Sequence, residues 1–378
     1  MRYKEINNAD IKMWVPFVDD KTQEQVENIT RLPNIFKHIA LMPDCHLGVG
    51  VPIGCVLALT DMVVPNAVGV DIGCGMAAYN TGIQEIDHPI LQEIVDDIKK
   101  VIPVGFNHQS EPQQWDGFDK APDSKIVQDH LDKARYQLGT LGGGNHFIEI
   151  QCGSDGFIWV MLHSGSRNFG LQIAQYYNKR AMDIHPDSPK QLAYFERYQK
   201  AFDEYMIDMN FALAFAHENR MNMLRKIKDV IKSKGFELDS NPPILIHHNF
   251  ASEEEHFGEK VIVHRKGATP AFKGQLGIIP GSQGTKSYIV EGLGNPESFM
   301  SCSHGAGRVL GRKQAKKTLD FEAEKAILDE QGIIHSMNSV SDLDEASGAY
   351  KDIQEVMENQ SDLVKIVVEL SPLAVVKG

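Results

Sequence analysis

The order of hydrophobic and polar positions predicts both strands and helices along this chain. Short apolar, β-branched runs flanked by glycine or turn residues predict strands at 55–59, 157–162, 244–246 and 261–264. An apolar period near 3.6 predicts a long helix that begins at Ser188-Pro189 and runs to residue 235 with one or two breaks. Its buried face is expected at Leu224, Ile227 and Ile231. The mixture indicates an α+β fold, with mixed sheets and flanking helices.

The chemically interesting residues are spread over most of the chain, which favours one domain. They lie at strand ends or in glycine-rich turns, where functional sites usually form. No internal repeat, low-complexity tract or proline-rich linker divides the 378 residues. We therefore expect a single domain over 1–378, with a polar surface insertion at about 107–125.

Composition and charge narrow the classes of function. Hydrophobic content of 42% and charged content of 24% are typical of a soluble globular protein. No apolar run has the length of a membrane span, and the N-terminus lacks the apolar core of a signal peptide. The five cysteines have no disulfide-framework spacing, so we expect a cytoplasmic protein. The net charge of −13 disfavours broad coating by nucleic acid, so any nucleic-acid contact needs a local basic patch.

Five residues have the types and surroundings of transition-metal ligands. Asp71 and Cys74 lie three apart in the glycine turn GVDIGCGM, and His146 follows three glycines that could also approach a phosphate. His163 ends an apolar strand, and His248 is the second histidine of a pair. Each alone is more often a structural residue, but their combination predicts a metal centre. Two ions about 3.5–4 Å apart, bridged by Cys74, would use all five ligands, and Zn, Mn, Fe and Co all remain possible.

A further histidine, His304, lies in the glycine-rich segment SCSHGAGR at 301–308. Arg308, Arg312 and Lys316 follow at intervals of four and would share one helix face. A helix that starts near Gly305 would direct its N-terminal N–H groups at a phosphate beside His304. A solvated basic helix end is the simpler alternative for the cations. A neutral imidazole in such a field is a competent nucleophile toward phosphorus.

These segments together resemble the RtcB-type RNA-splicing ligases, which join an RNA 3′-phosphate or 2′,3′-cyclic phosphate end to a 5′-hydroxyl end. The resemblance covers nearly the whole chain, through KMW, FKHIALMPDCHLG, GVDIGCGM, GNHFIEI, HSGSR, HHN, RKGA, IIPGS, SCSHGAGR, AYKDI and VVKG. It implies the α+β fold of that family with a central metal and nucleotide cleft. It also implies two Mn²⁺ ions as the metal and GTP as the energy donor.

The resemblance assigns a place to each expected metal ligand. Cys74 would bridge the two Mn²⁺ ions. Asp71 and His163 would be partners of one ion, with His146 and His248 on the other side of the pair.

The same resemblance implies the remaining roles. His304 would be the guanylylated nucleophile, and Asp44 the general base for the incoming 5′-hydroxyl. Glu149 would accept hydrogen bonds from the guanine edge, which adenine cannot donate. The full set of nucleotide contacts would be Asn145, Phe147, Glu149, Asn249, Ser287, Gly305, Ala306, Gly307, Tyr350 and Lys377. RNA phosphates would be held by Arg167, Lys266, Arg308 and Arg312.

The expected activity is therefore GTP- and Mn²⁺-dependent RNA ligation through a histidine–GMP intermediate, in RNA repair or tRNA splicing. Alternatives are an RNA 3′-phosphate guanylyltransferase that seals poorly, a metal-dependent phosphodiesterase without need of a nucleotide, and an RNA-binding protein without turnover. The expected partners are RNA ends and, as in some relatives, an archease-like activator, with the protein acting as a monomer.

Overall fold

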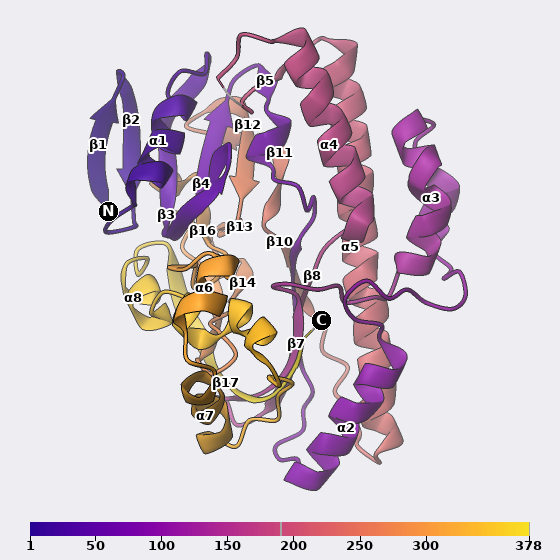
Figure 1. Cartoon of the computed structure of the whole chain (residues 1–378). Helices are drawn as coiled ribbons and strands as arrows, with labels where there is room; N and C mark the ends of the chain where they lie inside the picture. Colours follow the sequence, from indigo (N-terminus) through magenta and orange to yellow (C-terminus); the bar gives the residue numbers. More distant parts are fainter. Residues whose placement is uncertain (190, 378) are drawn as a thin grey trace.

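The computed structural model describes residues 1–189 and 191–377 and is built around two large β-sheets (Figure 1). The first sheet has six strands in the order β1-β2-β3-β4-β12-β11. Only β2 and β3 are parallel neighbours within it. Its strands are β1 (Arg2–Ile6), β2 (Ala9–Met13), β3 (Ile35–Val49), β4 (Val51–Leu59), β11 (Asn249–His256) and β12 (Glu259–Lys266).

The second sheet has seven strands in the order β10-β6-β8-β7-β17-β15-β14, and all neighbours are antiparallel. The C-terminal strand β17 returns to the middle of this sheet, between β7 and β15. Its strands are β6 (Gly75–Asn80), β7 (Phe147–Gly153), β8 (Ile158–Ser164), β10 (Ile244–His247), β14 (Leu276–Ile279), β15 (Ser287–Gly292) and β17 (Val364–Lys377). Two pairs of short strands complete the sheets: β5 (Met62–Val63) with β9 (Phe195–Glu196), and β13 (Ala268–Pro270) with β16 (Ser301–Ser303).

The longer helices form one layer beside the sheets. The long helices α4 (Arg167–Ile184) and α5 (Lys200–Ser233) run beside each other, with α3 (Lys125–Gln137) against α4 (Figure 1). Aromatic side chains of α4 and α5, such as Phe169, Phe211 and Phe215, fill the space between them. Helix α2 (His88–Val101) packs against α5 and buries Ile94 and Ile98 over the second sheet.

Shorter elements surround the two sheets. They are α1 (Asp20–Ile29), α6 (Arg312–Thr318), α7 (Phe321–Glu330), α8 (Ile353–Glu358) and the 3₁₀ helices η1 (Pro65–Ala67), η2 (Asp116–Lys120), η3 (Pro296–Ser298), η4 (Val340–Glu345) and η5 (Ser347–Ala349). Within 107–125, where we expect a polar surface insertion, η2 buries Phe118 in the aromatic core of α4 and α5. No helix among the described residues is long and apolar enough to cross a membrane.

The predicted α+β class is confirmed, and so are the four predicted strands, which fall in β4, β8, β10 and β12. The predicted face of the long helix is also confirmed, since Leu224, Ile227 and Ile231 are buried against the second sheet. The predicted start of that helix is wrong. Helix α5 begins at Lys200, because the residues before it form β9, which pairs with β5 and buries Phe195 in the core. From Lys200 the helix continues to Ser233 without a break.

Candidate active site

The five expected metal ligands lie at one end of four adjacent strands. In the order β10-β6-β8-β7, Cys74 precedes β6, His146 precedes β7, His163 lies at the end of β8, and His248 follows β10. Because neighbouring strands are antiparallel, the starts of β6 and β7 meet the ends of β8 and β10. Asp71 joins them from the turn before Cys74, whose N–H donates to the Asp71 carbonyl at 3.0 Å.

The ligand atoms form two groups that share Cys74. One group is Cys74, His163 and His248, and the other is Asp71, Cys74 and His146, with all ligand atoms of a group within 4.8 Å of one another. The Cys74 Sγ lies 3.2 Å from His163 Nε2 and 3.5 Å from His146 Nε2. The predicted partnering of Asp71 with His163 is therefore wrong.

The turn after β8 explains this grouping. A Cβ at Gly165 would lie only 2.4 Å from Asp71 Oδ1, and the Ser166 hydroxyl, which donates to the Ile72 carbonyl, lies 3.3 Å from the same oxygen. The carboxylate is thereby held on the His146 side, with Asp71 Oδ2 3.2 Å from His146 Nε2. His163 is left with His248, at an Nε2–Nε2 distance of 3.3 Å.

Hydrogen bonds to backbone carbonyls fix the tautomers of two of these rings. His146 Nδ1 lies 3.0 Å from the Leu141 carbonyl oxygen, and His163 Nδ1 lies 2.9 Å from that of Asn145. A carbonyl only accepts, so each Nδ1 carries the proton and each Nε2 presents a lone pair toward Cys74.

The electrostatics of the cluster fit a bound cation. Burial lowers the pKa of His163 and His248 well below the usual value, so both rings are neutral. Burial, and then the charge of Asp71, raise the pKa of the Cys74 thiol. Burial opposes ionisation of Asp71, yet the adjacent His146 ring and the charge of Arg167 hold the pKa of that carboxyl below its usual value. The cluster therefore gathers imidazole lone pairs, a thiol and a carboxylate at one point, a donor set that suits a transition metal.

A buried arginine, which the sequence analysis missed, ties the ligand turns together. Arg220 of α5 is 0% exposed, and its Nη1 donates to the carbonyls of Gly73 at 2.9 Å and Ser164 at 2.7 Å. Its Nη2 lies 3.0 Å from His247 Nδ1. Burial lowers its pKa to about 10, so it remains charged near neutral pH. The signal for Arg220 in the sequence is a charged residue within the apolar face of a predicted helix.

His304 lies beside the metal-ligand cluster and is oriented by Asp44. The ring centroids of His304 and His248 are 4.8 Å apart. Asp44 Oδ2 lies 2.6 Å from His304 Nδ1 and accepts from the His304 backbone N–H at 3.1 Å. The Nδ1 proton is therefore held by the carboxylate, which leaves the Nε2 lone pair free. Asp44 itself is 0% exposed and lies beneath His304, and its Oδ1 has no hydrogen-bond partner among the described residues.

The predicted helix start near Gly305 is wrong. The chain is irregular from His304 to Leu310, and α6 begins only at Arg312. Gly307 has a φ of +74°, and a Cβ there would lie 2.3 Å from the Asp44 carbonyl oxygen. The segment is therefore bent to pack on β3, which a helix would not allow.

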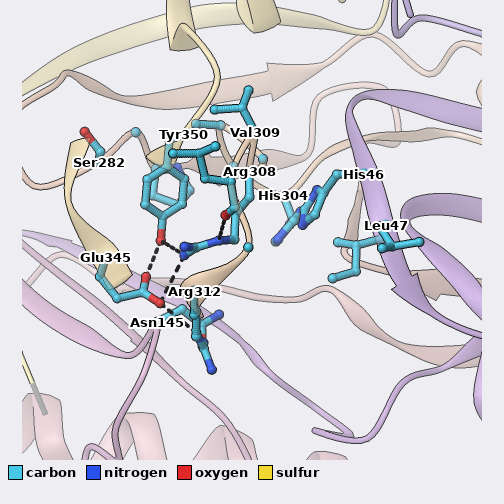
Figure 2. A pocket seen from close by; sticks show the side chains of 18 of the residues that line it. His46, Leu47, Asn145, Ser282, His304, Arg308, Val309, Arg312, Glu345 and Tyr350 are labelled. Carbon is cyan, nitrogen blue, oxygen red and sulfur yellow. Dashed lines mark hydrogen bonds and ion pairs between the residues drawn. The ribbon is translucent and has the colours of Figure 1, made fainter. Parts of the chain in front are cut away.

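A cavity of about 790 Å³ opens in front of His304 (Figure 2). Most of the residues expected to contact the nucleotide line it, together with two of the expected phosphate ligands. These residues are Asn145, Phe147, Glu149, Gly305, Ala306, Gly307, Arg308, Arg312, Tyr350 and Lys377.

Four expected contact residues do not line this cavity. Asn249 instead donates to the Asp71 carbonyl at 3.1 Å, and Ser287 Oγ accepts from the Gly281 N–H at 3.1 Å. Lys266 is buried with its ammonium group on two backbone carbonyls, and burial lowers its pKa to about 8.

Arg167, the fourth, lies on the far side of the metal ligands. Its Nη1 is 3.4 Å from His146 Nδ1, and its Nη2 donates to the Gly105 carbonyl at 3.2 Å. A Cβ at Gly142 would lie 1.9 Å from that Nη1. The first of the three glycines before His146 therefore makes room for a guanidinium group.

A second buried carboxylate, Glu345, was also missed by the sequence analysis. Glu345 is 3% exposed and lies 3.1 Å from Arg308 Nη1, 3.0 Å from Arg312 Nε and 3.7 Å from Lys377 Nζ. The Tyr350 hydroxyl donates to it as well (Figure 2). Burial opposes its ionisation, but the nearby Lys377, Tyr350 and arginines hold its pKa below the usual value. Arg308, Arg312, Tyr350 and Lys377 thus converge on one carboxylate at the cavity wall.

Glu149 lies at the wall of the same cavity with fewer partners. Gln151 Nε2 donates to its Oε2 at 2.7 Å. Burial raises the pKa of Glu149 to about 8, although the charge of Lys377 acts in the opposite direction.

The fold and the site define a single-domain α+β protein with a cluster of residues that could hold a transition metal, next to a histidine-lined cavity. A family model described as tRNA-splicing ligase RtcB matches residues 25–378. The chain is 40% identical to the RNA-splicing ligase RtcB of Escherichia coli K12 over 98% of both proteins. It is 30% identical to the tRNA-splicing ligase RtcB of Thermococcus kodakarensis over 98% of this chain and 94% of that one, and 33% identical to that of Nanoarchaeum equitans over the same shares. The chain therefore belongs to the RtcB family of RNA-splicing ligases.

Proposed function

We propose that the protein is a GTP- and Mn²⁺-dependent RNA ligase that joins 3′-phosphate or 2′,3′-cyclic phosphate ends to 5′-hydroxyl ends. The observation that carries the proposal is the placement of His304. Its Nδ1 is held by buried Asp44 at 2.6 Å, and its ring lies 4.8 Å from that of the expected metal ligand His248. An oriented imidazole with a free Nε2 is the nucleophile that a covalent nucleotide intermediate needs.

Asp71, Cys74, His146, His163 and His248 would hold the metal ions, with Cys74 common to both groups. A bound Mn²⁺ pair would offset the negative charge that develops on the phosphoryl groups during transfer. The donor set of one thiolate, one carboxylate and three imidazoles suits a borderline transition metal better than Mg²⁺ or Ca²⁺, which prefer oxygen ligands.

The reaction proceeds in three transfers. His304 Nε2 attacks the α-phosphorus of GTP, a nitrogen–phosphorus bond forms, and pyrophosphate leaves. The RNA 3′-phosphate then takes the guanylyl group from His304, which gives a phosphoanhydride at the RNA end. The 5′-hydroxyl finally attacks the RNA phosphorus of that anhydride and GMP leaves. A 2′,3′-cyclic end is first hydrolysed to the 3′-phosphate.

The cavity offers contacts for the nucleotide and for RNA phosphates. The Glu149 carboxylate, once ionised, can accept from guanine N1–H and N2–H. Arg308 and Arg312 line the same cavity and can pair with phosphate oxygens. Every group that the reaction needs comes from one chain, so a monomer suffices.

The test is covalent labelling with GTP that carries radioactive α-phosphate, in the presence of Mn²⁺. The wild-type protein should acquire label at one histidine, and His304→Ala should acquire none, while His88→Ala, an exposed histidine at the start of α2, should label normally. Paired RNA oligonucleotides with 3′-phosphate and 5′-hydroxyl ends should be sealed only with GTP. Normal labelling of His304→Ala contradicts the proposal. Labelled RNA that is not sealed indicates the guanylyltransferase alternative, and activity without GTP indicates a phosphodiesterase.

A further inference from the structure

The cavity has two sides, and His304 lies between them. Figure 2 shows Glu345 and Tyr350 on one side of His304, and His46 and Leu47 on the other. The first side holds the residues expected to contact the nucleotide. The other side has Leu47 and Ile53 beside His46, and the cavity wall also includes Asp19, Asp20 and Lys21 at the start of α1. If the nucleotide occupies the first side, the second side is free for the RNA end that attacks.

The backbone around His46 is displaced from its sheet. Residues 42–45 of β3 lie opposite the single residue Gly54 of β4, because the register shifts between the pairs Leu41–Cys55 and His46–Ile53. Irregularities of this kind redirect side chains near active sites. Lys351 Nζ fixes the displaced segment by donating to the Pro43 and Cys45 carbonyls, at 3.1 and 2.7 Å.

The same displacement fixes the tautomer of His46. Its Nδ1 lies 2.8 Å from the Asp44 carbonyl oxygen, which can only accept, so Nδ1 carries the proton. The Nε2 of His46 therefore presents a lone pair, and none of the described residues donates a hydrogen bond to it. Asp44 contributes its carbonyl to His46 and its carboxylate to His304, so this one residue orients both imidazoles.

Asp44, the alternative general base in this region, is poorly placed to reach an RNA 5′-hydroxyl. The Asp44 carboxylate is buried beneath His304, and its Oδ2 already accepts from the ring and from the backbone of that residue. His46 is half-buried and lines the cavity. Burial lowers the pKa of His46 to about 4, so its ring is neutral but a weak base in the protein alone. A bound phosphoanhydride beside the ring favours the imidazolium that results.

We propose that His46 is the general base of the sealing step and accepts the proton of the RNA 5′-hydroxyl at Nε2. The inference rests on the proposed ligase function and reassigns the base role that the sequence resemblance gives to Asp44. The 5′-oxygen forms a bond to the RNA 3′-phosphorus while the bond from that phosphorus to the bridging oxygen of GMP breaks. The hydroxyl proton passes to His46 Nε2, and GMP leaves with the electron pair of the broken bond.

The test separates sealing from the earlier transfers. The substrate is an RNA whose 3′-phosphate already carries GMP through a phosphoanhydride, mixed with a 5′-hydroxyl RNA and Mn²⁺ without GTP. His46→Gln and His46→Asn, whose amides cannot take up the proton, should seal this substrate about 100-fold more slowly, in the range of general-base catalysis. Covalent labelling of both variants by GTP should stay within about threefold of wild type. His88→Gln, on the exposed end of α2, is the matched control and should seal at the wild-type rate.

Each outcome has one meaning. Sealing by both His46 variants at the wild-type rate overturns the proposal. An equal loss of labelling and of sealing overturns it too, because His46 would then only maintain the site. If wild-type protein is not labelled by GTP at all, the proposed ligase function fails. If wild-type protein labels and seals and the His46 variants do so equally well, only the role of His46 fails.

Discussion

Two polar clusters lie near His304, and they differ in the balance of charge that they hold. In the metal-ligand cluster, three imidazoles, the Cys74 thiol and the Asp71 carboxylate point at one another. In the Glu345 cluster, one carboxylate meets two guanidinium groups, an ammonium group and a phenol.

The difference shows what each cluster requires of its ligand. Converging lone pairs in a buried site are unfavourable unless a cation joins them, so the first cluster is preorganised for a metal ion. In the second cluster three cations share one carboxylate, so a phosphate can take over one of them while the others stay paired with Glu345. Metal binding should therefore depend on rigid placement, and phosphate binding on rearrangement.

The largest expected effect comes from removing the ligand that both metal groups share. Cys74→Ala should weaken Mn²⁺ binding by about 1,000-fold or more, beyond the 10- to 100-fold typical of a lost outer partner. Isothermal titration of the metal-free protein with Mn²⁺ measures this affinity. The matched control is Cys152→Ala at the partly exposed cysteine of β7, which should bind normally. Wild-type affinity in Cys74→Ala would remove the basis for the metal centre.

Arg220 tests whether the rigidity of that cluster matters. Arg220→Leu leaves the Gly73 and Ser164 carbonyls without their buried donor. We expect Mn²⁺ affinity to fall about 100-fold and the free energy of unfolding to fall by about 3 kcal/mol. Arg220→Lys should recover part of both, and Arg225→Leu, at an exposed arginine of the same helix, should change neither. Unfolding in urea and Mn²⁺ titration give the two values. A loss of stability without a loss of affinity would show that Arg220 supports the fold alone.

The contrast between the clusters also explains what the sequence predicts and what it does not. The types of the metal ligands and their positions at strand ends are local features, and the motifs around Asp71, His146 and His163 carry them. Their grouping depends on the register between β7 and β8 and on the turn at Gly165, which no local pattern contains.

The buried charges were invisible for a related reason. Arg220 binds the carbonyl of Gly73, which is 147 positions away, and Arg308 and Arg312 reach Glu345 across 37 and 33 positions. In a sequence, such a residue looks like any polar position on a helix or in a loop. The irregular segment at Gly307 likewise follows from packing on Asp44, whereas the basic period of four predicts a helix there.

Glu149 is intermediate between the metal-ligand cluster and the Glu345 cluster. It is a buried carboxylate with a cation nearby, but it forms no ion pair closer than 4 Å among the described residues. Because burial raises its pKa to about 8, it is mostly protonated at neutral pH. Guanine N1–H and N2–H need the ionised form, so GTP affinity should rise about 15-fold from pH 6.5 to pH 8. Fluorescence titration with a labelled GTP across this range measures the slope. In Glu149→Gln the affinity should be lower and independent of pH.

The raised pKa of Glu149 acts on stability in the opposite direction to its effect on GTP affinity, because stability falls as the pH rises. The folded-state pKa of Glu149 lies above its ordinary value of 4.5, so its contribution to stability is full below about pH 4.5 and is lost as the pH rises through 8. Wild-type protein should therefore lose stability relative to Glu149→Gln over that interval. Equal pH profiles of the two proteins in thermal unfolding would contradict the assignment of the shift to Glu149.

The smallest expected effect distinguishes the two arginines of the Glu345 cluster. The side chain of Arg312 is 51% exposed and that of Arg308 is 17% exposed, so Arg312 can leave Glu345 for an RNA phosphate at lower cost. Arg312→Ala should weaken RNA binding about fivefold and change the free energy of unfolding by less than about 0.5 kcal/mol. It should also reduce the slope of the logarithm of RNA affinity against the logarithm of salt concentration by about 0.7. Arg308→Ala should instead lower stability by about 2 kcal/mol, because it leaves Glu345 short of a buried partner. RNA binding measured at several salt concentrations, with urea unfolding of both variants, decides between them. Equal salt slopes for wild type and Arg312→Ala would mean that the exposed guanidinium group stays with Glu345 when RNA binds, and that the cluster is as rigid as the metal centre.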